Sequence, residues 1–85
     1  MIREAIWSIE SQGELRRLDR IVARRVVDAV TRYVSTGYGD IKRLKGRAAQ
    51  YRLRVGDYRV IFALDAARDE MVILHVRHRR EVYRD

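Results

Sequence analysis

Apolar and polar positions alternate along residues 51–62, YRLRVGDYRVIF, and this alternation predicts two β-strands. Between them, Gly56-Asp57 has the composition of a two-residue type II′ turn, because glycine supplies the positive φ required at its first position. A two-residue turn pairs the residues that flank it, here Val55 with Tyr58. We therefore predict a β-hairpin whose register follows from its turn.

The predicted register brings arginine side chains together on one face. Arg54 falls directly opposite Arg59, and Arg52 lies on the same face, diagonal to Arg59. Like charges directly opposite one another destabilise a hairpin by roughly 0.2–1 kcal/mol. Binding of a polyanion would offset this cost, so we interpret the three arginines as candidate phosphate-binding residues.

Apolar periodicity predicts one strand and two helices before the hairpin. Residues 2–9 predict the strand, and residues 10–18 predict a short helix. The clearest helix covers residues 19–35, with Asp19 as its N-cap and Gly37 just past its end. Apolar residues at helical spacing form its predicted buried stripe, namely Leu18, Val22, Val26, Ala29, Val30, Tyr33 and Val34, with Ile21 beside them.

Two further segments flank the hairpin. Residues 41–49 predict an irregular basic lead-in, and residues 71–77 predict a fourth strand. The core face of this strand is predicted to hold its alternate apolar side chains, Val72, Leu74 and Val76. His75 and Arg77 then lie on the side away from the core. The loop before this strand leaves open whether that side is also the arginine face of the hairpin.

The predicted elements follow the order β-α-α-β-β-β. This order indicates an α+β fold, in which a helical hairpin packs on one face of a small antiparallel sheet. The opposite face of the sheet is then left for function. A length of 85 residues suits one domain, which we expect to span residues 1–85.

Composition narrows the class of protein. Of all residues 47% are hydrophobic, which is ordinary for a globular fold. The chain has no cysteine and two histidines, so we expect neither a disulfide framework nor a catalytic zinc site. No apolar run approaches the ~18 residues of a membrane span, and the first residues do not resemble a signal peptide. We therefore expect a soluble cytoplasmic protein that uses no metal or cofactor and does not contact a membrane.

The positive charge of the chain is concentrated in its second half. The formal net charge is +7, of which residues 1–41 contribute +1 and residues 42–85 contribute +6. A basic surface of this kind attracts nucleic acid or an acidic protein partner. Bases just before the hairpin are assigned to general attraction of RNA, and these are Lys42, Arg43, Lys45 and Arg47.

The arginine face is suited to metal-free chemistry on a phosphodiester. RNA supplies its own nucleophile, the 2′-hydroxyl, so an enzyme has to align it, stabilise charge on the phosphate and manage two protons. Arginine forks bind phosphate bidentately but are poor proton carriers, because their pKa exceeds ~12. Tyrosine or histidine can assist with protons or stack on a base. The further candidates lie near the end of the chain and are Arg77, His78, Arg79 and Tyr83.

Four stretches of the chain resemble the RelE/ParE superfamily of bacterial and archaeal toxins. They are LKG at residues 44–46, YRLR at 51–54, GDYRVIF at 56–62 and VRHRREVYR at 76–84. The resemblance implies the toxin half of a type II toxin–antitoxin pair, with the compact α/β fold and antiparallel sheet of that superfamily. It also implies an acidic, partly disordered antitoxin as cognate partner.

Members of this superfamily act in two ways. RelE-like toxins enter the ribosomal A site and cleave mRNA through 2′-hydroxyl attack, whereas ParE-like toxins poison DNA gyrase and lack the catalytic set. In RelE-like toxins, basic residues on the second and third strands, an arginine after the fourth strand and a C-terminal tyrosine form the active site. By resemblance, these catalytic positions fall on Arg52, Arg54, Arg59, Arg79 (or Arg77, depending on a gap) and Tyr83.

The resemblance also implies a role for each catalytic position. Arg59 would hold the scissile phosphate, Arg52 and Arg54 would stabilise charge, Arg79 would assist the leaving group and Tyr83 would stack on or activate the nucleotide. The best-known member has lysines where this chain has Arg52 and Arg54. Any proton transfer by such a lysine must then pass to Tyr83, to His78 or to solvent.

We therefore expect a metal-independent endoribonuclease of the RelE type that acts on mRNA at the ribosome. Two alternatives stay open. The first is a ParE-like inhibitor of DNA gyrase without nuclease activity. The second is a non-enzymatic module that binds RNA or DNA, whose affinity would fall steeply with salt.

Overall fold

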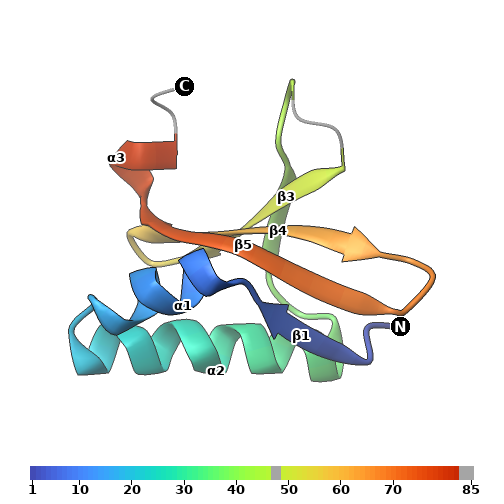
Figure 1. The fold of residues 1–85 in the computed structure, drawn as a ribbon, viewed down its shortest axis with the longest axis horizontal. Helices are drawn as coiled ribbons and strands as arrows, with labels where there is room; N and C mark the ends of the chain where they lie inside the picture. The colour runs from blue at the N-terminus through green and yellow to red at the C-terminus, as the bar shows by residue number, and fades with distance from the viewer. Residues whose placement is uncertain (47–48, 83–85) are drawn as a thin grey trace.

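The computed structural model describes residues 1–46 and 49–82 (Figure 1). Its elements follow in the order β1 (Glu4–Trp7), α1 (Ile9–Arg16), α2 (Arg20–Thr36), β2 (Asp40–Arg43), β3 (Gln50–Val55), β4 (Tyr58–Asp65), β5 (Glu70–His78) and α3 (Arg79–Val82). The strands form one sheet in the order β1-β5-β4-β3-β2. The long helix α2 lies across one face of this sheet, and α1 lies between α2 and β5 (Figure 1). No helix in the described ranges is long and apolar enough to cross a membrane.

The sheet has one more strand than predicted and is not entirely antiparallel. The lead-in predicted over residues 41–49 is in part a strand, because β2 pairs antiparallel with β3 from Asp40↔Arg54 to Arg43↔Tyr51. The prediction was wrong because charged residues dominate β2, and charges are common on edge strands, where they discourage pairing with other chains. At the other edge, β1 is shorter than the predicted strand over residues 2–9 and runs parallel to β5.

The central hairpin has the predicted register. Val55 pairs with Tyr58, and Arg54 pairs with Arg59 across β3 and β4. Gly56 has a φ of 59°, in the region that a type II′ turn requires at its first position. The turn chemistry therefore sets which residues share a face along both strands.

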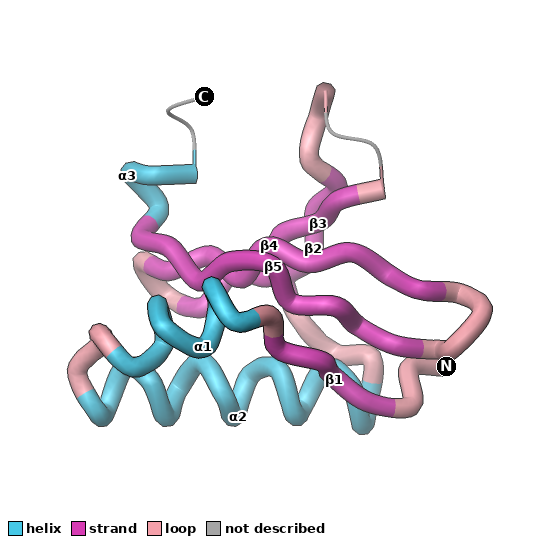
Figure 2. The backbone as a smooth tube through the Cα atoms, viewed as in Figure 1, coloured by secondary structure: helices cyan, strands magenta, loops and turns pink. Residues whose placement is uncertain are grey.

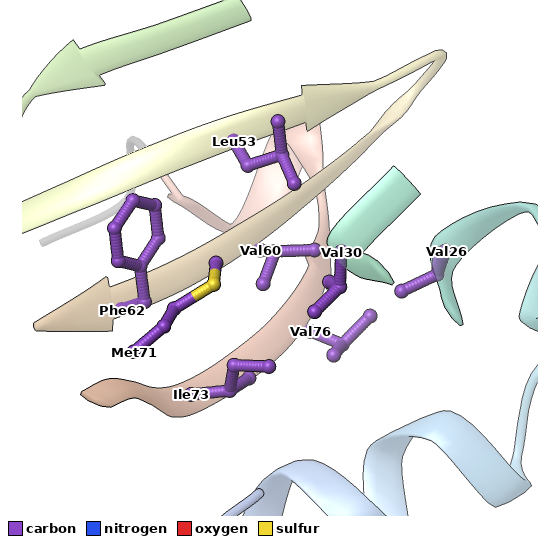
Figure 3. Close-up of a cluster of buried hydrophobic side chains, with 8 residues drawn as sticks. All are labelled: Val26, Val30, Leu53, Val60, Phe62, Met71, Ile73 and Val76. Carbon is purple, nitrogen blue, oxygen red and sulfur yellow. The ribbon is translucent and has the colours of Figure 1, made fainter. Parts of the chain in front are cut away.

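The hydrophobic core lies between α2 and the face of the sheet that α2 covers (Figure 3). Its buried residues come from α2, β3, β4 and β5 and are Val26, Val30, Leu53, Val60, Phe62, Met71, Ile73 and Val76. The ring of Phe62 lies between Tyr33 and Tyr51, with centroid distances of 5.7 Å and 5.6 Å. Burial, with a smaller contribution from Tyr51, raises the pKa of Tyr33, so this phenol stays neutral within the packed layer.

The helix α2 begins and ends as predicted, but one apolar residue lies outside the core. The Asp19 carboxylate accepts a hydrogen bond from the Ile21 amide at 2.9 Å, and Gly37 has a φ of 75°. Ile21 itself is 67% exposed, contrary to its predicted place beside the buried stripe. Successive helical residues are rotated by about 100°, so Ile21 points away from the direction that Val22 and Val26 share.

A β-bulge in β5 changes the predicted core face of this strand. Phe62 pairs with Ile73, whereas the preceding Ile61 pairs with His75, which leaves Leu74 as an extra residue. The buried side chains are therefore Met71 and Ile73 before the bulge and Val76 after it, with Val72 and Leu74 only half-buried. The predicted set was wrong for those two residues, because a bulge shifts the alternation by one position.

The junction of β1 and α1 closes the outer edge of β5 (Figure 2). The Ser8 amide donates to the Ile73 carbonyl at 3.0 Å, and the Ser8 hydroxyl donates to the Leu74 carbonyl at 3.1 Å. One turn further along α1, a Glu14 carboxylate oxygen accepts the Val76 amide at 2.9 Å. The backbone carbonyl of Leu74 and the backbone amide of Val76 lie beyond the part of β5 that pairs with β1, and they form their hydrogen bonds with the side chains of Ser8 and Glu14.

Candidate functional site

Three arginines form a row across the centre of the sheet. Arg54 on β3 pairs with Arg59 on β4, and Arg59 pairs in turn with Arg77 on β5. All three lie on the face opposite the one that α2 covers, because Val60, the next residue of β4, is buried in the core. We call Arg54, Arg59 and Arg77 the arginine row. The pairing answers the question that the sequence left open, since β5 presents Arg77 on the hairpin's arginine face.

A second line of side chains lies beside the arginine row on the same face. Lys42 pairs with Arg52, Arg52 with Ile61, and Ile61 with His75. Ile61 is 3% exposed, so it forms an apolar floor between Arg52 and His75. The face therefore combines fixed cations, one imidazole and a small apolar surface.

Arg59 is the most buried member of the arginine row. It is 7% exposed, and its Nη1 donates to the carbonyls of Gly56 and Tyr58 at 2.9 Å each. Its Nε is buried and has no hydrogen-bond partner among the described residues. Buried polar groups are normally satisfied, and a buried cation between like charges is unfavourable without an anion. The centre of the row therefore has the properties of an anion-binding site.

Asp40 supplies a negative charge at one end of this face. Arg52 Nη1 donates to the Asp40 carbonyl at 3.0 Å and to its carboxylate at 3.2 Å. Arg54 Nη1 lies 4.0 Å from the other carboxylate oxygen. The Arg52 side chain is 13% exposed, and its Nε is also unpaired in the described part of the chain. Asp40 thus holds Arg52 in place and partly neutralises two cations of the face.

Asp40→Asn is expected to strengthen binding of single-stranded RNA by about two- to fivefold. This change in affinity corresponds to the free energy that a part-exposed ion pair contributes. The variant removes the competing charge, while the Asp40 backbone carbonyl still holds Arg52. Fluorescence anisotropy with a labelled oligonucleotide at several salt concentrations measures the effect. Asp28→Asn is the control, because it removes the same charge from an exposed pair with Arg24 on α2. Equal affinities for the two variants would show that Asp40 does not compete with RNA.

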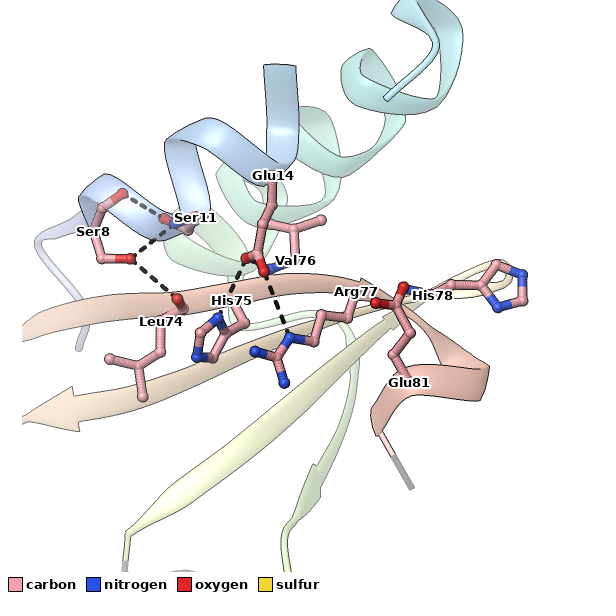
Figure 4. A network of polar contacts seen from close by, with 9 residues as sticks. All are labelled: Ser8, Ser11, Glu14, Leu74, His75, Val76, Arg77, His78 and Glu81. Carbon is pink, nitrogen blue, oxygen red and sulfur yellow. Dashed lines mark hydrogen bonds and ion pairs between the residues drawn. The ribbon is translucent and has the colours of Figure 1, made fainter. Parts of the chain in front are cut away.

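Glu14 supplies a negative charge at the other end of the face (Figure 4). One of its carboxylate oxygens lies 3.3 Å from His75 Nδ1 and accepts the Val76 amide. The other oxygen lies 3.5 Å from Arg77 Nε. The Glu14 side chain is 22% exposed, so three groups of β5 surround a partly desolvated carboxylate.

Arg79 lies at the first position of α3, beside the hairpin turn. Its amide donates to the Asp57 carbonyl at 2.7 Å, and its Nε lies 3.7 Å from the Asp57 carboxylate. The Arg79 side chain is 56% exposed. Arg77, and not Arg79, therefore stands opposite Arg59 in the sheet, although both arginines lie near its end.

His78 caps α3 and lies on the other face from the arginine row. Its Nδ1 accepts the Arg80 amide at 3.2 Å, and its own amide donates to the Glu81 carboxylate at 3.2 Å. This reciprocal arrangement is that of a capping box. The His78 ring meets the edge of Tyr58 at 5.4 Å between centroids, on the side of the sheet that faces α2. These contacts give His78 a structural role in the described part of the chain.

The predicted basic lead-in is divided between the two faces of the sheet. Lys42 lies on the arginine face, whereas Arg43 pairs with Tyr51, whose ring stacks on buried Phe62, and so lies on the opposite face. Lys45 is exposed in the turn that follows β2. Two predicted site residues, Arg47 and Tyr83, lie outside the described residues.

The predicted set of site residues omitted three residues of this face. His75 was predicted to share the side of Arg77 by alternation, but it was not chosen as a site candidate. Asp40 and Glu14 gave no such signal, since their places depend on the β2–β3 register and on how α1 meets β5. Within residues 1–46 and 49–82, no three His, Asp or Glu side chains gather in a way that could hold a metal ion.

Comparison with protein families gives a match over almost the whole chain. A family model described as the ParE toxin of the type II toxin–antitoxin system parDE matches residues 5–83. No curated protein sequence matches the chain.

Comparison with solved structures gives close matches of fold. A RelBE toxin–antitoxin complex from Mycobacterium tuberculosis matches with a TM-score of 0.81 at 21% identity, over 92% of this chain and 99% of that chain. An archaeal RelE–RelB complex from Pyrococcus horikoshii matches with a TM-score of 0.75 at 24% identity, over 93% and 97%. A mutant of the E. coli toxin RelE in the free state matches with a TM-score of 0.76 at 18% identity, over 98% and 92%. These matches confirm the predicted α+β fold.

Proposed function

Since this chain belongs to the ParE toxin family, within the RelE/ParE superfamily of type II toxin–antitoxin systems, we propose that it is a toxin that cleaves mRNA on the ribosome. The proposal goes beyond the family match, because the RelE/ParE superfamily includes both nucleases and gyrase poisons. Cleavage of translating mRNA would place its action in the cytoplasm.

The observation that supports this proposal is the buried guanidinium of Arg59 between Arg54 and Arg77. Its Nε has no hydrogen-bond partner in the described part of the chain and lies within a row of like charges, where an added anion would be stabilised. A phosphodiester supplies that anion, and planar guanidinium groups bind it bidentately. The row crosses three adjacent strands, so the guanidinium groups are carried by a rigid part of the fold.

The proposed reaction uses the nucleophile of the substrate. The 2′-oxygen attacks the adjacent phosphorus, the bond from phosphorus to the 5′-oxygen breaks, and the products are a 2′,3′-cyclic phosphate and a 5′-hydroxyl. Arg59 and Arg77 would stabilise the charge on the non-bridging oxygens, because fixed cations act most strongly where water is excluded. Arg52 and Arg54 would hold neighbouring phosphates, and Arg79 and Tyr83 would contact the leaving group and the base.

The test of this proposal is cleavage of mRNA by the purified toxin on ribosomes stalled at a defined codon. We expect cleavage in the A-site codon, a cyclic phosphate at the new 3′ end, and no comparable cleavage of the same RNA without ribosomes. Bound RNA without any cleaved product would contradict the nuclease and favour a non-enzymatic nucleic-acid-binding module.

A second candidate function is inhibition of DNA gyrase, and the match to the ParE family model over residues 5–83 favours it. A supercoiling assay with purified gyrase tests it directly. Loss of supercoiling together with intact mRNA on ribosomes would support this candidate over the nuclease. Cleaved mRNA with unaffected gyrase would exclude it.

We also propose that an acidic antitoxin segment covers the outer surface of α2. Relatives of this fold were crystallised as RelE–RelB and RelBE complexes. In this chain, Ile21 and Val27 are 67% and 37% exposed on α2, beside Arg20 and Arg24. Exposed apolar residues among bases suit an acidic amphipathic partner.

The surface of α2 continues into a groove of about 330 Å³ between α2 and β1. Its apolar lining includes Trp7, Val27, Val30 and Val34, with Arg3 and Glu4 at its rim. Val27 borders both the groove and the exposed surface around Ile21. One extended or helical segment could therefore contact both regions in a continuous interface.

Ile21→Asp is expected to weaken the complex with the cognate antitoxin at least tenfold. The change replaces exposed apolar area with a charge that repels an acidic partner, and a tenfold loss corresponds to about 1.4 kcal/mol. Isothermal titration of the purified toxin variant with antitoxin measures it. Leu64→Asp is the control, because Leu64 is 41% exposed on β4 and lines neither the surface around Ile21 nor the groove between α2 and β1. Equal affinities for wild type and Ile21→Asp would place the antitoxin elsewhere.

A further inference from the structure

We propose that His75, oriented by Glu14, is the general base of the arginine face. This inference rests on the proposed nuclease function and identifies a proton carrier for it. The arginine row can bind and polarise a phosphate, but guanidinium groups do not exchange protons near neutral pH. His75 was not among the predicted site residues, and its role follows from its position and its contacts.

The position of His75 places it next to the arginine row. It pairs with Ile61, two residues from the Arg59↔Arg77 pair, and shares their face of the sheet. Its side chain is 31% exposed, so the ring is held by the protein but stays accessible. Figure 4 shows one ring nitrogen directed towards Glu14 and the other directed away from it.

Glu14 fixes the orientation of the His75 ring. Nδ1 lies 3.3 Å from the Glu14 carboxylate, and the same carboxylate oxygen accepts the Val76 amide at 2.9 Å. A carboxylate accepts only from a protonated nitrogen, so the neutral ring holds its proton on Nδ1. The lone pair is then on Nε2, which no described residue engages in a hydrogen bond. A carboxylate that orients a histidine in this way is a recurrent element of enzymatic proton transfer.

Charged groups of both signs surround the ring. Arg77 on the same strand, Arg59 on β4 and Arg52 on β3 share the face of His75 and oppose an additional positive charge. Glu14 on α1 is the acidic group that faces it, and stabilises the imidazolium once the ring has taken a proton. The arginines disfavour the imidazolium and Glu14 favours it, so Glu14 is the group that assists proton uptake by the ring in general base catalysis.

The proton balance of the step is complete without a metal or cofactor. Nε2 takes the proton of the 2′-hydroxyl while the 2′-oxygen forms its bond to phosphorus. The bond to the 5′-oxygen breaks, and this oxygen takes a proton from water to give the 5′-hydroxyl. The hydroxide that remains takes the proton from the His75 imidazolium, which restores the neutral ring.

His75→Asn tests this role, because asparagine can still donate a hydrogen bond to Glu14 but cannot accept the proton. We expect mRNA cleavage on ribosomes to fall at least 100-fold, with ribosome binding and melting temperature unchanged. Wild-type cleavage should decrease towards acid pH as the base is protonated, and this decrease should be absent in the variant. In His75→Ala, added imidazole should restore part of the lost rate, which a purely structural role does not predict.

The second histidine of the chain provides a matched control. His78 caps α3 on the opposite face, and asparagine is a preferred N-cap residue, so His78→Asn should cleave within about twofold of wild type. Glu14→Gln keeps an acceptor for the Val76 amide but removes the charge, and should lower the rate about tenfold with an altered pH profile. Glu14 is therefore a positioning residue and not a catalytic one.

The outcomes separate this inference from the function on which it rests. If wild type and His75→Asn cleave mRNA at rates within threefold, the base assignment is wrong and the nuclease stands. If wild type does not cleave mRNA on ribosomes, the proposed function fails and the base assignment fails with it. If His78→Asn loses activity as His75→Asn does, the effect is not specific to the arginine face, and the assignment is also overturned.

Discussion

Arg59→Gln is expected to lower mRNA cleavage on ribosomes by about 10³-fold while the protein stays folded. Arg59 is the central member of the arginine row, and its buried Nε has no hydrogen-bond partner among the residues that the structure describes. Removal of one preorganised donor to a developing oxyanion costs roughly 10²–10³ in rate, and Arg59 also contributes a full charge. Single-turnover cleavage on stalled ribosomes measures the loss.

The stability of this variant separates function from folding. Glutamine is too short to replace the Nη1 bonds to the Gly56 and Tyr58 carbonyls, but it also removes one of three neighbouring like charges, and the two effects offset each other. We therefore expect the free energy of unfolding to change by less than about 1 kcal/mol, in either direction. Arg59→Lys should also be slow, because a lysine keeps the charge but loses the planar fork. Arg68→Gln, in the exposed loop before β5, is the control and should cleave normally.

Phe62→Ala is expected to lower the free energy of unfolding by about 3–5 kcal/mol. Phe62 is fully buried, and its ring packs against Tyr33 and Tyr51, so truncation opens a cavity between two aromatic rings. A domain of this size has only about 5–10 kcal/mol of stability to lose. Urea denaturation followed by tryptophan fluorescence measures the change.

Leu64→Ala provides the matched control for that prediction. Leu64 lies two residues further along β4 and is 41% exposed, so its truncation should cost at most about 1 kcal/mol. A loss in Phe62→Ala no larger than in Leu64→Ala would mean that the aromatic cluster is not the centre of the core.

The parts of the fold that were predicted correctly have local causes. The turn at Gly56 sets the Val55↔Tyr58 pair, and the cap at Asp19 sets the start of α2. Such features involve residues close together in the chain, so the identities of a few neighbouring residues are enough to predict them. The predicted alignment of Arg54 with Arg59 followed from the same local argument.

The parts that were not predicted depend on contacts between distant segments. The bulge at Leu74 shifts the core face of β5, and nothing in the residues around it marks the extra position. Its carbonyl is satisfied by Ser8, from the other end of the sequence. The orientation of His75 likewise depends on Glu14, which belongs to α1.

In the candidate site, too, the features with local causes were predicted and those that depend on distant segments were not. The alignment of the hairpin arginines was predicted from alternation, but which of Arg77 and Arg79 stands opposite Arg59 required the register of β5 against β4. Asp40 was not considered, because β2 had been read as irregular. The acidic partners of the face were therefore missed, whereas most of its basic residues were found.

The parallel pairing of β1 with β5 also has a consequence for the order of events during biosynthesis. Ser8 bonds to Leu74, 66 positions away, so the first strand has no sheet partner until the chain has been made as far as β5. Long-range pairings of this kind form late and slow the folding of small domains. β5, the last strand, also brings Arg77 and His75 to the arginine face. A nascent chain therefore lacks the assembled arginine face until β5 has been made.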